Sequence, residues 1–318
     1  MRLGSGIIAA FAFALTVGTA WADNPPAAPP PGMSAEQLAT LQKYQAIAAK
    51  LHPQFGDVPV PGAHATLHLG KAYYFLPADQ ARLVLVDAWR NPKEAADGIA
   101  GMVFPAGKGF ASDTWAAVIT YDDQGYIPDG DAKTVDYSEM IKSAQDHEGD
   151  INDRRKQEGL DSIHLVGWAQ PPYYDQPHHS LIWAREIAFQ NQTDNALNYD
   201  VRELGRGGVL SMNILSNMSK IGEVRAAANR LQNVGTFDPG YHYADYKSGV
   251  DKKAAYGIGG LVAAGIGVAL AQKLGLIGVV LLFAKKFFVI IATAAAGGFA
   301  WLRRLFGKSK DQPPSAAA

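Results

Sequence analysis

The chain has 318 residues, a formal net charge of −1 at pH 7, no cysteine, and a hydrophobic content of 48%. The near-zero charge argues against a nucleic-acid partner, because phosphate binding needs a basic face and no stripe of Lys and Arg with interleaved aromatics precedes the C-terminal tail. Without cysteine, neither a disulfide nor a lipid-modified cysteine can form. Stability must therefore come from core burial.

The first 33 residues predict an export signal and a linker. A short positive region precedes an apolar core from Ile7 to Val17, and Ala20-Trp21-Ala22 fits the small-x-small pattern that signal peptidase reads. The core is about a dozen residues, shorter than a comfortable membrane span. We therefore expect a cleaved signal peptide over residues 1–22. Residues 23–33 are rich in proline and predict a stiff, extended linker.

A globular domain is expected over residues 34–250. Ser34 and Gln37 form a capping-box pattern, and apolar residues follow at helical spacing until Pro53. In chain order, the first half of the domain predicts a helix over 34–51, extended chain over 65–76, a helix that opens at Pro77 and ends before Asn91, and a strand over 115–121.

Five aspartates between residues 122 and 136 raise the question of a calcium-binding loop. An EF-hand needs oxygen ligands at its first, third and fifth positions and glycine at the sixth. Counting from Asp129, the fifth position is Lys133 and the sixth is Thr134, so the spacing excludes this motif. We interpret the aspartates as turn residues and as the cap of a highly charged helix over residues 137–158.

The second half of the domain predicts an antiparallel meander. Its four runs, separated by turn residues, are 163–168, 181–187, 197–203 and 209–215. In the third run apolar residues alternate with Asn198, Asp200 and Arg202, a pattern typical of a strand with one solvated side. Gly205-Arg206-Gly207-Gly208 predicts a hairpin whose turn residues have positive φ. An amphipathic helix is predicted between Met218 and Gly235.

The C-terminal region predicts a membrane anchor, with the lipid bilayer as its partner. From Tyr256 to Leu302 the chain is almost entirely apolar, and four basic residues follow. This pattern is typical of a membrane-spanning segment whose positive end stays in the cytoplasm. We expect the anchor over residues 251–306 and a basic and polar tail over 307–318.

The number of membrane crossings has two alternatives. As a helix, Gly257 to Leu302 would be roughly 69 Å long, more than twice the hydrocarbon thickness. A hairpin turning at Lys285 and Lys286 fits this length, but it returns the basic tail to the periplasm against the positive-inside tendency. One span from Phe287, preceded by an interfacial helix, fits the charges but leaves only about sixteen apolar residues to cross. Length favours the hairpin.

Three motifs occur in order through the second half. They are Gly167-Trp168 with Pro172 and Tyr174-Asp175 (GW-x3-P-x-YD), residues 197–210 (LNY-x2-R-x-LGR-x-GVL), and Tyr243-Ala244-Asp245 (YAD). Together with Gly125-Tyr126 and the 129–131 stretch, they resemble a bacterial family of uncharacterised membrane-anchored proteins, whose domain has no assigned function. Tyr246 stands where the family pattern has Phe. The resemblance implies an envelope location and a C-terminal anchor, and it brings no catalytic residues.

The sequence contains no common catalytic motif: it lacks a G-x-S-x-G elbow, a Walker loop, an H-E-x-x-H helix and paired cysteines. His64 and His68 lie in a segment predicted to be extended. The neighbours His178 and His179 would point to opposite faces of a strand and could not easily share an ion. We therefore predict no catalytic residues, no metal site and no cofactor.

The polar face of the hairpin over residues 197–214 is the best candidate for a ligand site. The residues that could converge there are Asn198, Arg202, Arg206, Asp175 and His179. The planar guanidinium fork suits a carboxylate or a phosphate. The alternative is structural, with Arg202 paired to Asp175 or Asp200. Nearby aromatic residues form either core or an exposed patch for a partner or a glycan: Trp168, Tyr173, Tyr174 and Trp183.

These patterns predict an α+β fold, with an antiparallel sheet covered by helices and a C-terminal transmembrane helix or helical hairpin, because strands follow one another without intervening helices. The predicted location is the inner membrane, with the domain exported to the periplasmic side. The predicted function is a non-catalytic interaction or structural module, with an envelope protein as a possible partner. The alternative is a receptor or enzyme that acts on an anionic envelope ligand through the 197–214 hairpin.

Overall fold

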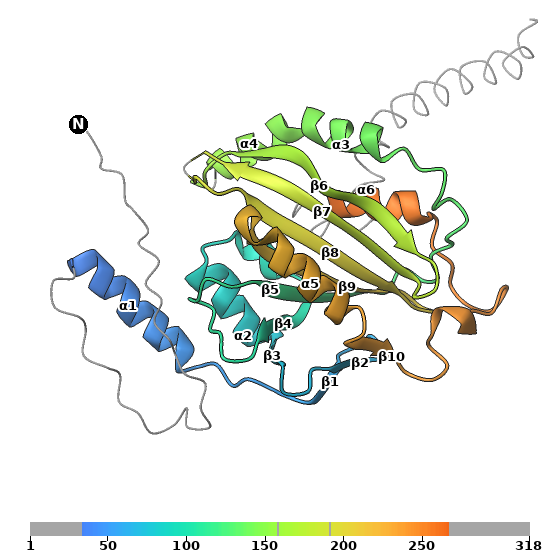
Figure 1. The fold of residues 1–318 in the computed structure, drawn as a ribbon, viewed down its shortest axis with the longest axis horizontal. Coiled ribbons are helices and arrows are strands. Elements are labelled where there is room, and N and C mark those ends of the chain that lie inside the picture. The colour runs from blue at the N-terminus through green and yellow to red at the C-terminus, as the bar shows by residue number, and fades with distance from the viewer. Residues whose placement is uncertain (1–33, 158, 191, 267–318) are drawn as a thin grey trace, which may run out of the picture. The chain divides into compact units, whose positions relative to one another are not determined.

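The computed structural model describes residues 34–266 except 158 and 191, and these residues belong to a single compact unit. The predicted signal peptide, linker and basic tail, and the predicted anchor beyond Ile266, lie outside the described residues. The described part has an α+β fold with antiparallel sheets and covering helices, as predicted (Figure 1).

The large sheet has seven antiparallel strands. In spatial order they are β3 (Tyr73–Pro77), β4 (Ile99–Pro105), β5 (Ala116–Asp122), β9 (Val209–Asn217), β8 (Ala196–Leu204), β7 (Ser180–Phe189) and β6 (Ile163–Asp175). Strands β6 to β9 form the predicted meander. A second sheet has the order β1-β2-β10 and contains β1 (Asp57–Val60), β2 (Ala65–His68) and β10 (Gly235–Phe237). Strands β1, β4 and β10 were not predicted.

The helices are α1 (Ala35–Ala48), α2 (Ala78–Arg82), the π-helix η1 (Leu83–Ala88), α3 (Tyr137–Asp146), α4 (Glu148–Gln157), α5 (Ile221–Leu231) and α6 (Ile258–Ile266). Three 3-10 turns accompany them: η2 (Lys93–Ala96), η3 (Met218–Lys220) and η4 (Tyr243–Asp245). The helix predicted over 34–51 is confirmed as α1. The single helix predicted over 137–158 is wrong in one respect, because His147 ends α3 before α4 begins. The extended segment 65–76 divides between both sheets at Gly70, whose φ is +56°.

One face of the large sheet, here called the α5 face, is covered by α5 and the small sheet. Figure 1 shows α5 lying across β8 and β9. Leu197, Tyr199 and Val201 point to this face and are fully buried, as their alternation predicted. They pack against the apolar stripe of α5, which consists of Val224, Ala227, Ala228 and Leu231.

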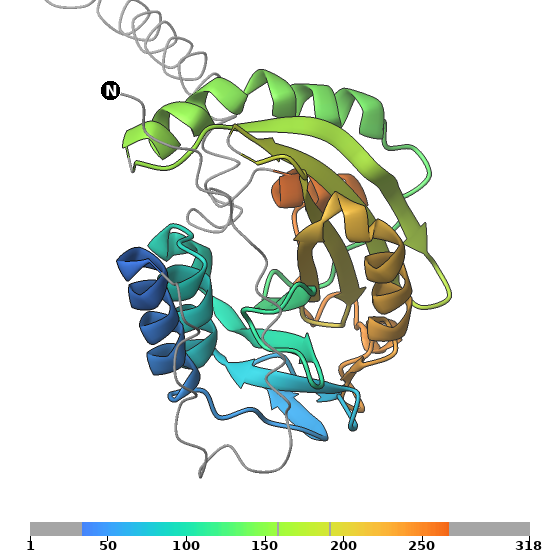
Figure 2. The same cartoon turned by 60° about the vertical axis from the view of Figure 1, so that its left-hand side comes forward.

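The opposite face, here called the α6 face, carries two separate apolar clusters. At the β3–β5 end, α1, α2 and η1 cover residues such as Met102 and Phe104. At the β6–β8 end, α6 lies inside the curve of the sheet and packs on residues such as Leu181 and Trp183 (Figure 2). Since both faces are covered, the central strands are buried on both sides.

Helix α6 belongs to the core of the described unit, although its sequence falls within the predicted anchor. Its buried side chains are Ile258, Leu261, Val262 and Ile266. Asp131 accepts hydrogen bonds from the backbone N–H groups of Ile258 and Gly259, at 2.8 and 3.0 Å, and so caps the first turn. Among the described residues, no helix is long and apolar enough to cross a membrane.

The acidic segment contains the predicted cap of the helix that begins at Tyr137. Asp136 caps α3 by accepting from the backbone N–H groups of Ser138 and Glu139. Asp131 caps α6, and Asp129 accepts a hydrogen bond from the Tyr174 hydroxyl at 2.9 Å. Each of these three carboxylates therefore has its own structural partner.

The glycines after β8 serve close packing, which corrects the prediction of positive φ in this turn. None of the glycines among residues 205–208 has a positive φ. A Cβ at Gly205 would lie 2.6 Å from the Phe237 ring, and a Cβ at Gly208 would collide with the Asp122 carbonyl oxygen. Glycine is needed here because neighbouring chain segments approach the backbone itself.

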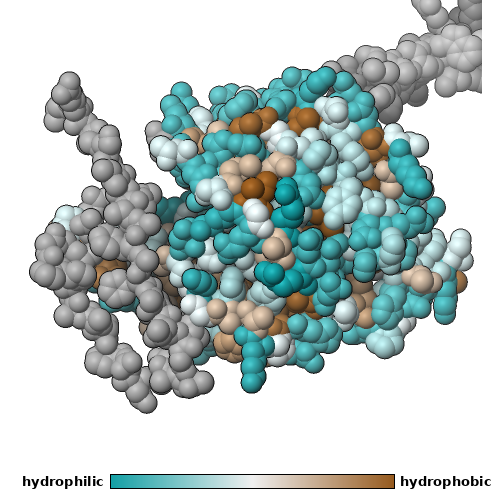
Figure 3. Space-filling model, in the orientation of Figure 1, coloured by the Kyte–Doolittle hydropathy of each residue, from teal (hydrophilic) through white to brown (hydrophobic). Residues whose placement is uncertain are grey.

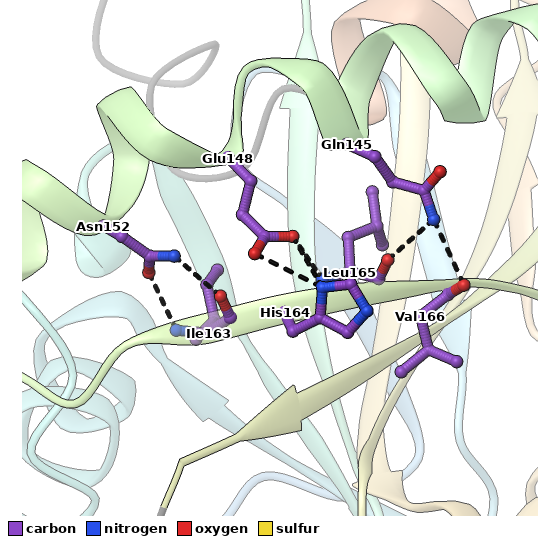
Figure 4. A network of polar contacts seen from close by, with 7 residues as sticks. All are labelled: Gln145, Glu148, Asn152, Ile163, His164, Leu165 and Val166. Carbon is purple, nitrogen blue, oxygen red and sulfur yellow. Dashed lines mark hydrogen bonds and ion pairs between the residues drawn. The ribbon is translucent and has the colours of Figure 1, made fainter.

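Strand β6 forms one edge of the large sheet, and side chains of α3 and α4 cover this edge (Figure 4). Asn152 both donates to the Ile163 carbonyl and accepts from the Ile163 N–H, each at 2.8 Å. Glu148 accepts from the Leu165 N–H at 2.9 Å, and Gln145 donates to the Leu165 and Val166 carbonyls. These amides and carboxylate occupy backbone groups that an edge strand would otherwise offer to another chain.

Replacing Asn152 with alanine tests this edge cover. Ile163 is buried, so its N–H and C=O would lose their partner, and we expect the free energy of unfolding to fall by about 1–3 kcal/mol. Amide exchange at Ile163 should also accelerate. Asp153→Ala, at an exposed position one residue further along α4, is the control and should change stability by less than about 0.5 kcal/mol. Equal stabilities of the two variants in urea denaturation would contradict the assignment.

Candidate functional site

A band of polar residues crosses the α6 face between its two apolar clusters. Cross-strand pairing places Asp200 opposite Trp183 and Asn213, and Arg202 opposite Ser211. Because directly paired residues share a face, the polar side chains of four neighbouring strands lie together. We call the following set the polar band: Thr120, Arg185, Asn198, Asp200, Arg202, Ser211 and Asn213.

The band is more buried than the sequence suggested. The prediction that Asn198, Asp200 and Arg202 form a solvated side is wrong, since Asp200 is 2% exposed and the other two are only partly exposed. The cause is α6, whose Gly265 approaches Arg202 and Trp183 closely. A strand can therefore alternate in polarity while both of its sides are covered.

Two arginines share one aspartate within the band. An Asp200 carboxylate oxygen lies 3.6 Å from the Arg202 guanidinium and the other lies 3.9 Å from that of Arg185. Arg185 also donates to the Ile266 carbonyl at 3.1 Å, which ties it to the last residue of α6. The pairing of Arg202 with Asp200 confirms one of the two predicted structural ion pairs.

Arg185 is an unusually placed charge. Burial lowers the pKa of its guanidinium, Arg202 lowers it further, and Asp200 opposes them. Its position in β7 places it in the same sheet row as Asn198 of β8. Arg202 extends over the Trp183 ring, with its guanidinium carbon 4.7 Å from the ring centroid, a cation–π arrangement.

Three of the predicted site residues, Arg206, Asp175 and His179, do not lie in the polar band with Arg202. Arg206 forms a bidentate salt bridge with Asp251, with N–O distances of 2.8 and 2.7 Å, and also donates to the Gly240 carbonyl. Asp175 pairs with His178 at 2.9 Å. Of the five residues proposed to converge, only Asn198 and Arg202 lie in the polar band.

His179 belongs to a second cluster, beyond the ends of these strands. Its Nδ1 lies 3.1 Å from the Tyr174 hydroxyl, which in turn donates to Asp129. Since that hydroxyl has one proton, His179 Nδ1 must donate to its oxygen. Burial, then the hydrogen bond to Asp129, raises the pKa of Tyr174. The His179 ring stacks on Tyr243, with 4.3 Å between centroids.

This second cluster brings together several of the motif residues. Tyr243 stacks on Tyr126, and Tyr126 stacks on Tyr246 at 3.9 Å. His179 has a φ of +50°, uncommon for a residue other than glycine. The stack joins loops that are far apart in the sequence, so we interpret the motif residues here as holding these loops against the sheet.

The four aromatic residues noted in the sequence separate in the structure. Trp183 is fully buried, and Tyr173 is 43% exposed. Trp168 and Tyr174 are partly buried against the same cluster as α6. They are therefore neither a single core group nor a single exposed patch.

The α5 face holds a buried carboxyl group at Glu203. Ser180 donates to it at 2.7 Å across the β7–β8 pair. Burial raises the pKa of Glu203 to about 8, and the Ser180 hydrogen bond opposes this shift only in part. The carboxyl is therefore protonated at neutral pH.

Sequence reasoning missed two members of the polar band, Arg185 and Thr120, and noted Trp183 only as an aromatic residue near the candidate site. Arg185 stands inside the apolar run Leu181 to Ile187, and a charge in such a run is the signal that could have marked it. Ser211 and Asn213 alternate with buried neighbours in the same way as Asn198 and Arg202. Whether these side chains lie beside those of β7 depends on strand register, which a single sequence does not show.

The described fold defines an α+β domain built on an antiparallel sheet with both faces covered. The chain belongs to the family described as "Protein of unknown function (DUF2167)", which matches residues 52–296. This confirms the predicted resemblance to an uncharacterised domain family. No curated protein matches the chain.

Among solved structures, the chain is similar to the solution structure of cyanobacterial PsbP (CyanoP) from Synechocystis sp. PCC 6803. The sequence identity is 8% and the TM-score is 0.32, and the match covers 59% of this chain and 92% of that chain. A likeness this distant carries no functional argument.

Glu203 gives the fold a definite pH dependence. Its carboxyl has an ordinary pKa of 4.5 and a folded-state pKa of about 8, so the folded state keeps a proton that the unfolded state releases between these values. The free energy of unfolding should therefore fall by about 1.4 kcal/mol for each pH unit within this window, and level off above it. Glu203→Gln should remove this slope. Urea denaturation of both proteins between pH 5 and 9 checks the prediction, and parallel pH curves would contradict it.

Proposed function

We propose that this protein is a non-catalytic interaction module of the cell envelope, exported by residues 1–22 and held at the inner membrane by the apolar segment that follows α6. The observation that supports this proposal is the docking of α6. Helix α6 starts the apolar stretch that extends to Leu302, and Arg185 holds the carbonyl of its last residue.

The docking of α6 changes the length available for an anchor. Residues 267–302 remain, about 54 Å as a continuous helix, still longer than one hydrocarbon crossing. Lys285 and Lys286 divide them into arms of about 18 and 16 residues, near the short limit for a span. A short hairpin is the arrangement we propose.

The non-catalytic part of the proposal rests on the partners of the charged residues. Arg206 is held by Asp251, Asp175 by His178, and Asp131 by the first turn of α6. In the described residues these groups have structural partners.

The surface suits polar contacts. Figure 3 shows a mostly hydrophilic face with small, separate hydrophobic patches. Within the described residues, the large hydrophobic side chains that are exposed come from separate segments: Phe55, Val166, Tyr173, Tyr241 and Val250. A partner would therefore meet a surface of the kind found in non-obligate interfaces.

Membrane fractionation tests the tether. The full chain should remain in the inner-membrane fraction after an alkaline wash, and protease added to spheroplasts should digest the domain. Arginine costs about 2.5–3.5 kcal/mol at the centre of a span, so Val279→Arg combined with Ile291→Arg, one in each arm, should release the protein. Val250→Arg, at a position 77% exposed, is the control and should stay bound. Retention of the double variant, or protection of the domain from protease, would contradict the proposal.

A second candidate function is the binding of an anionic ligand. It is favoured by one observation, the excess of arginine over aspartate in the polar band.

A further inference from the structure

The polar band buries an unbalanced charge. Arg185 and Arg202 contribute two positive charges and Asp200 contributes one negative charge, which leaves a net charge of +1. The Arg185 and Asp200 side chains are only 6% and 4% exposed. Removing an unpaired charge from water is costly, so natural proteins seldom keep one without a compensating group.

The same residues carry polar atoms without partners. Four of their buried atoms have no hydrogen-bond partner in the described structure: the donors Arg185 Nε, Arg202 Nε and Trp183 Nε1, and one acceptor, Asp200 Oδ2. Donors therefore outnumber acceptors among them, and the great majority of buried donors in proteins are paired. An acceptor with negative charge would satisfy both the donors and the excess charge.

These donors are held close together. The Arg202 guanidinium lies over the Trp183 ring, and Arg202 and Arg185 meet on the same Asp200 carboxylate. Helix α6 forms one wall, because a Cβ at Gly265 would lie 2.6 Å from the Trp183 ring and 2.8 Å from Arg202 Nη2. Glycine thus leaves room for the helix backbone beside the two side chains.

One further polar group borders the cluster. Tyr256 precedes α6, and its buried hydroxyl has no partner in the described residues. Burial raises the pKa of this hydroxyl, Asp122 raises it further, and Arg202 lowers it. The Arg202 side chain is 16% exposed, so it is the member of the cluster that meets solvent.

We propose that Arg185, Arg202 and Trp183 Nε1 form a binding site for a small oxyanion group, a carboxylate or a phosphate. Two guanidinium groups and an indole N–H suit several oxygens of one anion, and the anion would neutralise the cluster. Water could accept some of the hydrogen bonds but would leave the charge uncompensated. Arg202 gives the anion its access from solvent. This inference deepens the second candidate function and does not depend on the membrane tether.

The same chemistry can come from two sources, a free anion or the headgroup of an anionic lipid. A headgroup is a natural source because α6 leads directly into the apolar segment proposed as the anchor. Both sources present the same charged oxygens to the two arginines.

Thermal unfolding of the full chain in a non-ionic detergent tests the site, with inorganic phosphate as the probe and chloride at equal ionic strength as the reference. Phosphate should raise the unfolding midpoint of the natural protein by a few degrees, because it binds only the folded state. Arg202→Met keeps an apolar stem over Trp183 but removes the charge excess, so its response should disappear. Asp200→Asn increases the excess, so its response should exceed that of the natural protein.

Two further variants keep this test decisive. Arg82→Gln removes an arginine from an exposed ion pair with Asp97 and should respond as the natural protein does. Arg202→Lys retains the charge and should retain part of the response, even if Arg202→Met folds poorly. Equal responses in all variants would show a non-specific salt effect and overturn the proposal. If both Arg202→Met and Asp200→Asn are less stable and phosphate stabilises none of the proteins, the proposal is overturned and the residues form a structural ion-pair network.

The source of the anion is then assigned in vesicles. If a lipid headgroup fills the site, added phosphate should stabilise the protein in phosphatidylcholine vesicles but add little in phosphatidylglycerol vesicles. Equal phosphate responses in both would support the site with a free anion as its ligand.

Discussion

The docking of α6 on the large sheet is the interaction on which the rest of the described structure depends. The helix is apolar along its length, yet polar groups hold both of its ends. Asp131 accepts from the N–H groups of its first turn, and Arg185 donates to the carbonyl of its last residue. These bonds satisfy groups that a helix leaves open at its ends, and they fix α6 in one position on β7 and β8.

The position of α6 determines the environment of the polar band. Because the helix covers the sheet there, Asp200 and Arg185 are buried and Arg202 is only partly exposed, so the charge excess that would be trivial on a surface becomes costly. The same docking brings part of an apolar C-terminal region into the core. Structure and proposed ligand binding thus share one cause, the close approach of α6 through Gly265 to Trp183 and Arg202.

Much of the fold could be predicted from local patterns. The meander and α1 follow from period-two and helical spacing, and Asp136 was recognisable as a cap. Strand β10 has only three residues and β1 contains Pro59, so neither carries a strand signal of its own. The solvated side predicted for Asn198, Asp200 and Arg202 was wrong, most clearly at the buried Asp200, because alternation within a strand does not reveal that a helix some sixty residues later covers it. Arg206 and His179 lie beyond the strand ends, where loop packing rather than periodicity decides their partners.

A thiol-labelling experiment tests the central claim most directly, because the chain has no cysteine of its own. Val262→Cys places a single thiol on the buried side of α6, and Val250→Cys places one at an exposed site. The docked helix predicts that a polar maleimide labels Val262→Cys far more slowly than Val250→Cys, and that adding Asp131→Ala accelerates labelling at position 262. Labelling of Val262→Cys as fast as Val250→Cys, or protection that is unchanged by Asp131→Ala, would contradict it.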